Sequence, residues 1–423
     1  MNRLILLAIV SWSVVPYKAW SRLLMGGEGF NLGDLVYVVL LGPVIIRLFT
    51  HRQREPMTLA IVLILAALGL SLVKGLVWGE NVRDILRIVR ATALWAVIPL
   101  VIAEIRDEAT LRKLLGGLAV VLIVVSVTII LFSWNPALVP TTDDMAVARE
   151  EWFGGFQRIF HVGMWGAVAG AIVALGVGFY DQRWRTAGPL VGLLMCFGLF
   201  FTFVRTFIML VVLSVGIFVL ERTRFNMKAL VKPLATAIVL LFLLSALPVG
   251  EKVMTAVSER MTSVLTADVS DIDPTDQEGL GTMVWRVLEA DACLGNLQGA
   301  WDHLLGAMGR SYTMEDGFTA STPHISYVGI YYSGGLIGTI AYLVFFGFVT
   351  VRLASNIRRE RDSELSWIHV PVFVTWIMLL IGAFNASLFQ FPYGVFSMAV
   401  LIGISEAARS IGASQRASLH AIA

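Results

Sequence analysis

Charged residues are scarce in this chain. Asp, Glu, Lys and Arg together make up 15% of its 423 residues, whereas hydrophobic residues make up 57%. Soluble domains carry about 25% charged residues, so this composition argues against an ordinary soluble protein. In place of charge the chain has repeated apolar runs of about 20 residues, the length of a helix that crosses a bilayer. The sequence therefore predicts an all-α polytopic membrane protein.

Cysteine is almost absent as well. Cys196 lies in an apolar run and Cys293 in a hydrophilic segment, so we expect neither a disulfide framework nor a cysteine-based metal site. We predict no metal and no cofactor. A small-x-small cleavage site is also missing after the first twenty residues, although Arg3 precedes an apolar stretch. We interpret that stretch as the first membrane span and not as a signal peptide.

Twelve apolar runs have lengths near that of a membrane span, and one long hydrophilic segment separates the ninth from the tenth. The runs lie at about 4–17, 34–49, 57–77, 85–103, 114–133, 159–179, 188–203, 206–220, 233–249, 325–351, 367–385 and 393–408. We therefore predict helices one to nine in residues 1–249, a loop domain in residues 250–324, and helices ten to twelve with a tail in residues 325–423.

The basic residues predict the orientation of these spans. More than half of the 32 Lys and Arg residues lie at the termini or in alternate loops, for example near Arg47, Lys113, Lys228 and Arg358. Positive charge favours the cytoplasmic side of a membrane. Both termini are therefore predicted to be cytoplasmic, and the loop domain is predicted to lie on the outer face.

The run from Pro189 to Leu220 contains one charge, Arg205. As a single helix the run would be about 48 Å long, well beyond the roughly 30 Å hydrocarbon core. Both flanks are basic, so two short helices should turn near Phe203 to Thr206 and carry Arg205 at the outer boundary. An arginine in such a run is a candidate functional residue. The alternative is an interfacial anchor.

Other arginines are also predicted at the outer boundary. Arg83, Arg87 and Arg90 recur at the spacing of one helix face, and Arg158 opens the sixth span with His161 one turn later. Guanidinium groups form paired hydrogen bonds with phosphate oxygens. The set therefore favours an anionic lipid head group as a ligand, whereas interfacial anchoring would explain each member alone.

The hydrophilic segment is acidic, and its acids cluster between Asp268 and Glu278. This cluster lies in a stretch typical of a solvated loop, so we predict no metal site there. Apolar positions between Met283 and Leu305 instead predict two short amphipathic helices lying over the membrane part. Arg286 belongs to the first of them, and Gly306 should end the second.

His324 lies where the hydrophilic segment meets the tenth apolar run. Thr322 and Pro323 can start a helix, which would place His324 in its first turn. The helix dipole would then favour a neutral imidazole that can accept a proton. The alternative is an interfacial polar residue without chemistry. Gly334 and Gly338 have the spacing of a helix packing motif.

Several aromatic residues accompany this boundary. Tyr327 is the first of them after His324, and we treat it as a candidate for stacking on a sugar. The alternative is the aromatic belt of an ordinary membrane protein. The other members are Trp152, Phe153, Tyr331, Tyr332, Phe391 and Tyr393.

Three motifs of the chain resemble those of the O-antigen ligase and polymerase superfamily, membrane glycosyltransferases of the GT-C class. His324-Ile325 followed by Gly335-Leu336-Ile337-Gly338 is similar to the family's histidine motif. Thr202-Phe203-Val204-Arg205 resembles its hairpin tip. Trp285-Arg286 and the later His303-Leu304-Leu305-Gly306 resemble its loop arginine and loop signature. Ile325 stands where the family usually has a polar residue, so the sequence names no partner that would orient the imidazole.

The resemblance implies a metal-independent, inverting glycosyltransferase of the bacterial inner membrane that faces the periplasm. Its donor would be an undecaprenyl-diphosphate-linked glycan. His324 would be the catalytic base, and Arg205 and Arg286 would stabilise the leaving diphosphate. Substrate contacts are expected from Arg83, Arg87, Arg90, Arg158, His303 and Tyr327.

Three functions stay open at this point. The preferred one is a ligase that uses lipid A-core as its acceptor, because the earlier outer loop is short and lacks the Arg and Gly spacing common in polymerases. An O-antigen or exopolysaccharide polymerase would use a second lipid-linked glycan. A twelve-span transporter would make no glycosidic product, but it should place its substrate groups near the bilayer midplane. No nucleic acid partner is expected.

Overall fold

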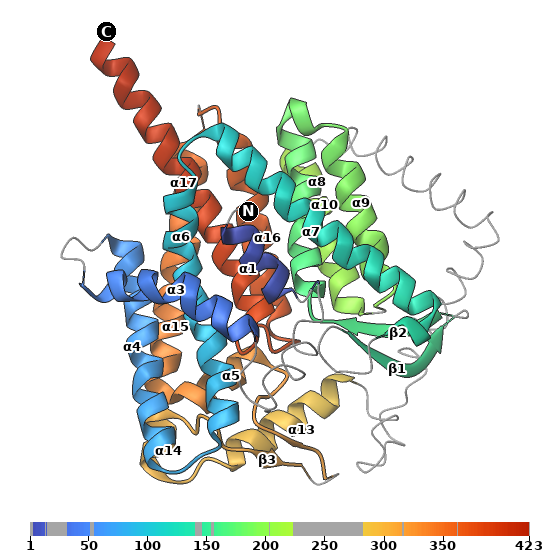
Figure 1. Ribbon diagram of the computed structural model, residues 1–423, viewed down its shortest axis with the longest axis vertical. Coiled ribbons are helices and arrows are strands. Elements are labelled where there is room, and N and C mark those ends of the chain that lie inside the picture. Colours follow the sequence, from blue (N-terminus) through green and yellow to red (C-terminus); the bar gives the residue numbers. More distant parts are fainter. Residues whose placement is uncertain are drawn as a thin grey trace. The chain divides into compact units, whose positions relative to one another are not determined.

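The computed structural model describes residues 3–12, 14, 32–50, 55–139, 146–153, 156–202, 204–222, 282–314, 317–361 and 363–422. These residues are mostly α-helical (Figure 1). They form two compact units, which we describe separately. Unit 1 comprises Met1–Val121 and Asp273–Ala423, and unit 2 comprises Leu122–Ile272.

Unit 1 holds helices from both ends of the chain, together with one small strand pair. Its elements are α1 (Arg3–Ser11), α3 (Leu32–Thr50), α4 (Pro56–Val77), α5 (Val82–Ala93), η1 (Leu94–Ala96), α6 (Val97–Glu104), α13 (Thr282–Gly295), α14 (Gly299–Leu305), β3 (Tyr312–Thr313), β4 (Thr319–Ala320), α15 (Ser326–Arg359), α16 (Ser366–Gly382) and α17 (Pro392–Ile422). α7 (Glu108–Trp134) contributes residues to both units.

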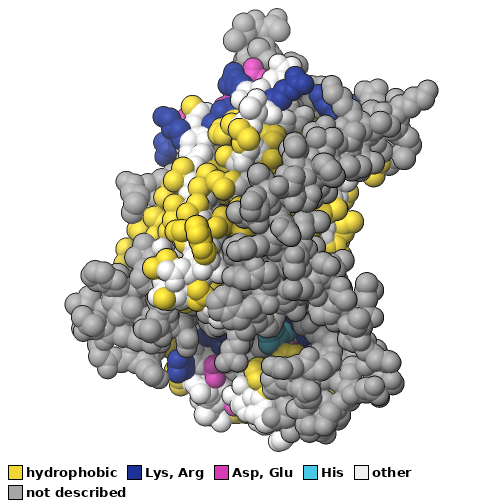
Figure 2. All heavy atoms as spheres, turned by 90° about the vertical axis from the view of Figure 1, so that its right-hand side faces the viewer, with side chains coloured by type: hydrophobic (Ala, Val, Ile, Leu, Met, Phe, Trp, Pro, Cys, Tyr) yellow, Lys and Arg dark blue, Asp and Glu magenta, His cyan; other side chains and the backbone are white. Residues whose placement is uncertain are grey.

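Six helices among the described residues are long and apolar enough to cross a membrane. They lie at Gly33–Thr50, Pro56–Val77, Val82–Glu104, Glu108–Trp134, Ser326–Arg359 and Pro392–Ala417, and shorter apolar helices lie at Met164–Tyr180, Ala187–Phe200 and Ser366–Gly382. Figure 2 shows hydrophobic side chains gathered over a broad area of one face. The prediction of an α-helical membrane protein is thus confirmed. The number of twelve spans stays a prediction, since the run at 233–249 lies outside the described residues.

Aromatic packing joins the helices of unit 1. Trp95 is fully buried, and its ring meets that of Phe345 with centroids 4.8 Å apart. The Trp95 indole N–H also donates to the Tyr342 hydroxyl over 3.3 Å. Fully burying an aromatic side chain is worth about 1.5–3 kcal/mol. This contact therefore fixes α15 against η1 at the start of α6.

α15 is broken near its start. Its 34 residues would extend about 51 Å as one straight helix, much farther than the hydrocarbon core. Gly335 interrupts the helix with φ 59° and ψ −159°, a conformation open essentially to glycine alone. The Tyr332 carbonyl near this break accepts the Ala307 N–H over 2.6 Å. The remaining part, residues 336–359, is long enough to span the core.

α13 and α14 lie at the end of unit 1 opposite to the end from which α17 projects (Figure 1). The prediction of two short helices between Met283 and Leu305 is confirmed, and Gly306 ends α14 with φ 78°. Val287 and Leu288 are exposed on α13, and Trp301 is exposed on α14. Each helix therefore has an exposed side with apolar residues and a buried side, and the buried side carries Glu289 in α13 and Asp302 in α14.

The described residues of unit 2 include three packed helices, with a strand pair before them. Its elements are η2 (Pro136–Leu138), β1 (Ala146–Phe153), β2 (Phe156–His161), α8 (Met164–Tyr180), η3 (Gln182–Trp184), α9 (Ala187–Phe200) and α10 (Arg205–Arg222). α8 packs on both α9 and α10. A Cβ atom at Gly188 would lie 2.7 Å from the Ala174 carbonyl oxygen, so glycine permits the close approach of α8 and α9.

Two predictions concern this unit. α9 ends at Phe200 and α10 begins at Arg205, which confirms two short helices with Arg205 beginning the second. The expectation that Arg158 opens the sixth span is wrong. Arg158 lies on β2, which pairs with β1 in an antiparallel hairpin, and the helix begins only at Met164. The prediction failed because the residues of β2 continue directly into the apolar run of α8, so that the sequence gives no clear boundary between strand and helix.

Candidate functional site

His324 lies just before α15, not inside it. The helix begins at Ser326 after Ile325, and no side chain caps its first turn. The predicted placement of His324 in the first helical turn is therefore wrong. The helix start is fixed differently, because the Ser326 hydroxyl accepts the Leu388 N–H over 2.5 Å and donates to the Ala386 carbonyl.

The turn between α16 and α17 holds the chain on both sides of His324. The Ser387 hydroxyl donates to the Pro323 carbonyl over 2.8 Å. The Ser326 N–H donates to the Ala383 carbonyl over 3.0 Å, and the Gln390 amide donates to the Ser326 carbonyl over 2.8 Å. The backbone around the histidine is thus bonded to a neighbouring loop on each side.

The imidazole itself is held by Glu289, on α13. Glu289 is completely buried. One of its carboxylate oxygens accepts the backbone N–H of His324 over 2.8 Å, and the other lies 2.9 Å from Nδ1 of the imidazole. The Tyr312 hydroxyl donates to the same carboxylate over 2.8 Å. Glu289 is thus the orienting partner that the sequence did not name.

Trp285 covers one side of the His324 ring. The two ring centroids are 5.1 Å apart and the planes are nearly perpendicular, at 80°. The side chain of His324 is 45% exposed. Among the described residues no hydrogen bond reaches Nε2 of this ring. The imidazole therefore has one engaged nitrogen and one nitrogen available to a ligand.

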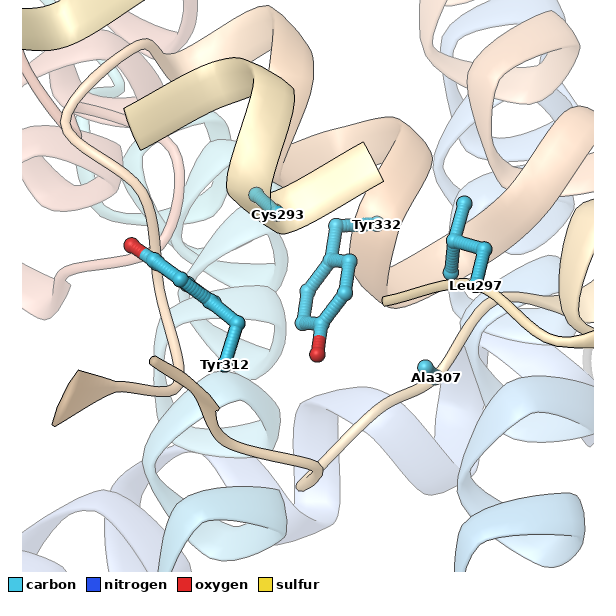
Figure 3. Packing of buried hydrophobic residues seen from close by; sticks show 5 residues of the cluster. All are labelled: Cys293, Leu297, Ala307, Tyr312 and Tyr332. Atoms are coloured by element: carbon cyan, nitrogen blue, oxygen red, sulfur yellow. The ribbon is translucent and has the colours of Figure 1, made fainter. Parts of the chain in front are cut away.

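A small buried core supports this arrangement (Figure 3). The Tyr332 ring lies between Tyr312 on one side and Leu297 and Ala307 on the other. Burial, together with the nearby Glu289 carboxylate, raises the pKa of Tyr312, so its hydroxyl stays protonated and donates a hydrogen bond to Glu289. The same two causes raise the pKa of the Cys293 thiol, which is fully buried. These groups are structural supports of Glu289.

A second buried network fastens α14 to the end of α4. Asp302 is fully buried and bonds to Lys74 and, over 2.6 Å, to Arg310. Arg310 also pairs with Glu80 over 2.7 Å. Burial alone would raise the pKa of Asp302, but hydrogen bonds from Lys74 and Arg310 outweigh it and lower that pKa. The network fixes the segment that leads towards His324.

Arg286 lies next to Trp285 on α13, three residues before Glu289. Its guanidinium atoms Nε and Nη1 are shielded from solvent. Residues three or four apart share a face of a helix, so α13 carries Trp285, Arg286 and Glu289 on adjoining positions. The structure thus brings Arg286 onto the helix that holds His324.

The three arginines of α5 differ in their contacts. Arg90 forms an ion pair with Asp34 over 2.6 Å. The guanidinium of Arg87 lies 4.3 Å from the ring centroid of Phe391, one residue after the Gln390 that bonds to Ser326. Arg83 is exposed in the first turn of the helix. Arg87 therefore lies beside the turn that holds the start of α15.

His303 and Tyr327 both make defined hydrogen bonds. His303 is exposed on α14, and its Nδ1 lies 2.9 Å from the Tyr331 hydroxyl. The Tyr327 hydroxyl donates to the Leu380 carbonyl over 2.8 Å, and its ring packs 4.4 Å from that of Phe384. Tyr327 thus ties α15 to α16, and its contact with a sugar stays a prediction.

Arg158 and Arg205 belong to unit 2. Arg158 is half-buried on β2, and Arg205 is the first residue of α10. His161, three residues after Arg158, is fully buried, and its Nδ1 accepts the Gly163 N–H over 2.9 Å. Burial lowers the pKa of His161 to about 4. His161 is therefore neutral, and it caps the turn into α8.

Comparisons with known proteins return no match, either to a family model or to a curated protein. Glu289 and Tyr312 are elements of the site that the sequence analysis did not single out, and Trp285, which it named only as a neighbour of Arg286, contacts the His324 ring. One signal in the sequence could have indicated Glu289. It is an acid four residues after Trp285 and four before Cys293, on one helix face, where an unsupported carboxylate would be costly if that face is buried.

Proposed function

We propose that this protein transfers a glycan from undecaprenyl diphosphate to a hydroxyl group of lipid A-core. The observation that carries the proposal is His324, a half-exposed imidazole with one ring nitrogen held by a buried carboxylate and the other open to a ligand. Such a histidine suits general base catalysis near neutral pH. The substrate class is taken from the resemblance of the sequence motifs to the O-antigen ligase and polymerase superfamily.

The proposed reaction is one displacement. The acceptor oxygen forms a bond to the anomeric carbon while the bond from that carbon to the diphosphate oxygen breaks. The diphosphate leaves with the electron pair, and Nε2 of His324 takes the proton of the acceptor hydroxyl. Inversion at the carbon and independence of metal follow from the resemblance.

Arginines would stabilise the charge that develops on the leaving diphosphate. Arg286 is assigned this role because it lies on the helix that holds His324. Arg205 is assigned it by the hairpin-tip motif, at the start of α10. Arg87 is the best placed further contact, beside the turn that binds the start of α15. We propose that the site faces the periplasm, with both termini in the cytoplasm.

The test is a transfer assay with purified protein, a lipid-diphosphate-linked glycan and two acceptors offered separately. Product on lipid A-core supports the ligase, and extension of a second lipid-linked glycan would make the protein a polymerase. Transport of the donor without any glycosidic product would refute the proposal that the protein is an enzyme.

His324→Ala is the informative variant in this assay. A general base contributes roughly 100-fold to 10,000-fold in rate, so transfer should fall by that factor while the protein still folds and inserts. His303→Ala removes another exposed histidine of the same segment, and as a predicted substrate contact it should change KM more than kcat. Wild-type turnover by His324→Ala would remove the proposed base.

A further inference from the structure

We infer that Glu289 is a positioning residue, which keeps the proton of the His324 imidazole on Nδ1 and thereby makes Nε2 the proton acceptor. The inference rests on the proposed function for its catalytic consequence. Its structural part, the tautomer of His324, can be measured independently of any activity.

The other hydrogen bonds of Glu289 show which group donates in its contact with Nδ1 of His324. One carboxylate oxygen receives the His324 N–H and the other receives the Tyr312 hydroxyl. An ionised carboxylate can only accept hydrogen bonds. The contact of 2.9 Å between Nδ1 and this carboxylate therefore places a proton on Nδ1. In a neutral imidazole the other nitrogen then has a free lone pair.

Burial indicates that this carboxylate has a specific role. A fully buried carboxylate is costly unless donors surround it. Within the described part of the chain, His324 is the one basic side chain at ion-pair distance from Glu289. An apolar residue would fill the same space without that cost. The presence of a buried acid at this position is explained if its negative charge acts on the imidazole.

One turn of α13 presents both contacts to the imidazole. Trp285 and Glu289 are four residues apart, which places them on the same helix face. The Trp285 ring meets the side of the imidazole, while the Glu289 carboxylate binds its Nδ1 edge. A rotation of the imidazole by 180° about its Cβ–Cγ bond would put Cδ2 in the place of Nδ1 and would break the Nδ1 hydrogen bond. The arrangement therefore selects both an orientation and a tautomer.

Glu289→Gln is the direct test. The amide has nearly the same shape, but its NH₂ group can donate to Nδ1 and so move the imidazole proton to Nε2. We expect kcat to fall roughly 100-fold, as for loss of the base itself, with KM within about twofold. In a His324→Ala background the same change should have no further effect, since Glu289 acts through that histidine.

The tautomer is read by ¹⁵N NMR of the histidine-labelled protein, with His324→Gln used to assign the signals. The wild type should show a protonated Nδ1 at His324, and Glu289→Gln should show a protonated Nε2. Tyr312→Phe is the matched control, because it removes a buried hydrogen bond to Glu289 but keeps the charge. It should lose only a few-fold in kcat and retain the wild-type tautomer.

Three results would overturn the inference: an unprotonated Nδ1 in the wild type, full kcat in Glu289→Gln, or losses that simply add in the double variant. A folding defect is recognised by a thermal midpoint that falls further in Glu289→Gln than in Tyr312→Phe. In that case the wild-type tautomer still decides the question. Absence of transfer by the wild-type protein would refute the proposed function, and the NMR result would stand apart from it.

Discussion

Arg87 contacts an aromatic ring, whereas Arg90 on the same helix is paired with an acid. Within the described part of the chain the Arg87 guanidinium has no hydrogen bond or ion pair of its own beside this ring contact. A hydrogen bond from it to a charged ligand would be worth about 1.5–3 kcal/mol. We therefore expect Arg87→Gln to raise KM for the lipid-diphosphate donor roughly tenfold, with a smaller change in kcat. Steady-state kinetics over a range of donor concentrations measures both constants.

Arg90→Gln is the matched control for this prediction. It removes a positive charge from the same helix, but that charge is already satisfied by Asp34 over 2.6 Å. It should lower the thermal midpoint and leave the donor KM nearly unchanged. Equal effects of the two variants on KM would show that Arg87 is only one more interfacial charge.

Asp302 makes stability depend on acid pH. Its pKa is lowered in the folded protein, because the hydrogen bonds from Lys74 and Arg310 outweigh its burial. A lowered folded pKa contributes stability that is complete above the unfolded value of about 3.9 and is lost as the pH falls through the folded value. Asp302→Asn should therefore show a smaller loss of thermal midpoint between pH 5 and pH 3 than the wild type.

The same variant should be less stable at pH 7. Removing one partner of a buried ion pair costs about 3–5 kcal/mol, and Asp302→Asn leaves Lys74 without its carboxylate. Thermal unfolding in detergent at a series of pH values gives both results. Parallel pH curves for the two proteins would contradict the assignment of this acid sensitivity to Asp302.

The residues of the site differ in whether the sequence alone identifies them. His324 and Arg286 could be singled out because each belongs to a local motif. Glu289 could not be joined to His324, because 35 residues separate them and only the folding of α13 onto the start of α15 brings them together. Local pattern identifies the reactive group, whereas its orientation depends on tertiary contacts.

The close packing of the end of α14 against α15 depends on Gly335. A Cβ atom there would lie 2.5 Å from the Leu304 carbonyl and from the Gly306 nitrogen, and φ is positive. We expect Gly335→Ala to cost at least about 1–3 kcal/mol from backbone strain alone. It should also loosen α14, which would appear as faster proteolysis of the segment before α15.

Gly338→Ala provides the control in the same helix. Its nearest neighbour would be the Leu68 side chain at 3.8 Å, an ordinary contact. Its thermal midpoint and its proteolysis rate should equal those of the wild type. Similar damage from both substitutions would show that the glycines act only through helix packing, as their sequence spacing alone suggests.

The sequence predicted the long apolar helices but neither the break in α15 nor the β hairpin. Apolar runs predicted α3, α4, α7 and α17 because membrane helices are selected by length and hydropathy, which are local properties. The break at Gly335 was not predicted, since a glycine inside an apolar run is equally compatible with helix packing. The β1 and β2 hairpin was missed because strand pairing depends on contacts outside a single window.

The proposed function requires that the chain cross the membrane in one orientation, with His324 on the outer side. The described spans confirm a helical membrane protein, and the side that each loop faces rests on the distribution of basic residues. Single cysteines can test it in a background with Cys196 and Cys293 replaced by alanine. Ala300 on α14 and Ala413 on α17 are both exposed positions for the new thiols.

We expect Ala300→Cys to react with a membrane-impermeant maleimide on intact spheroplasts, because α14 should face outwards with His324. Ala413→Cys should react only after the membrane is opened, because α17 should carry the C-terminal end into the cytoplasm. A fully exposed thiol with an ordinary pKa near 8.5 reacts readily at either position once reached. The reverse pattern would put His324 on the cytoplasmic side, where periplasmic lipid-linked glycan is out of reach, and the proposed transfer to lipid A-core would have to be abandoned.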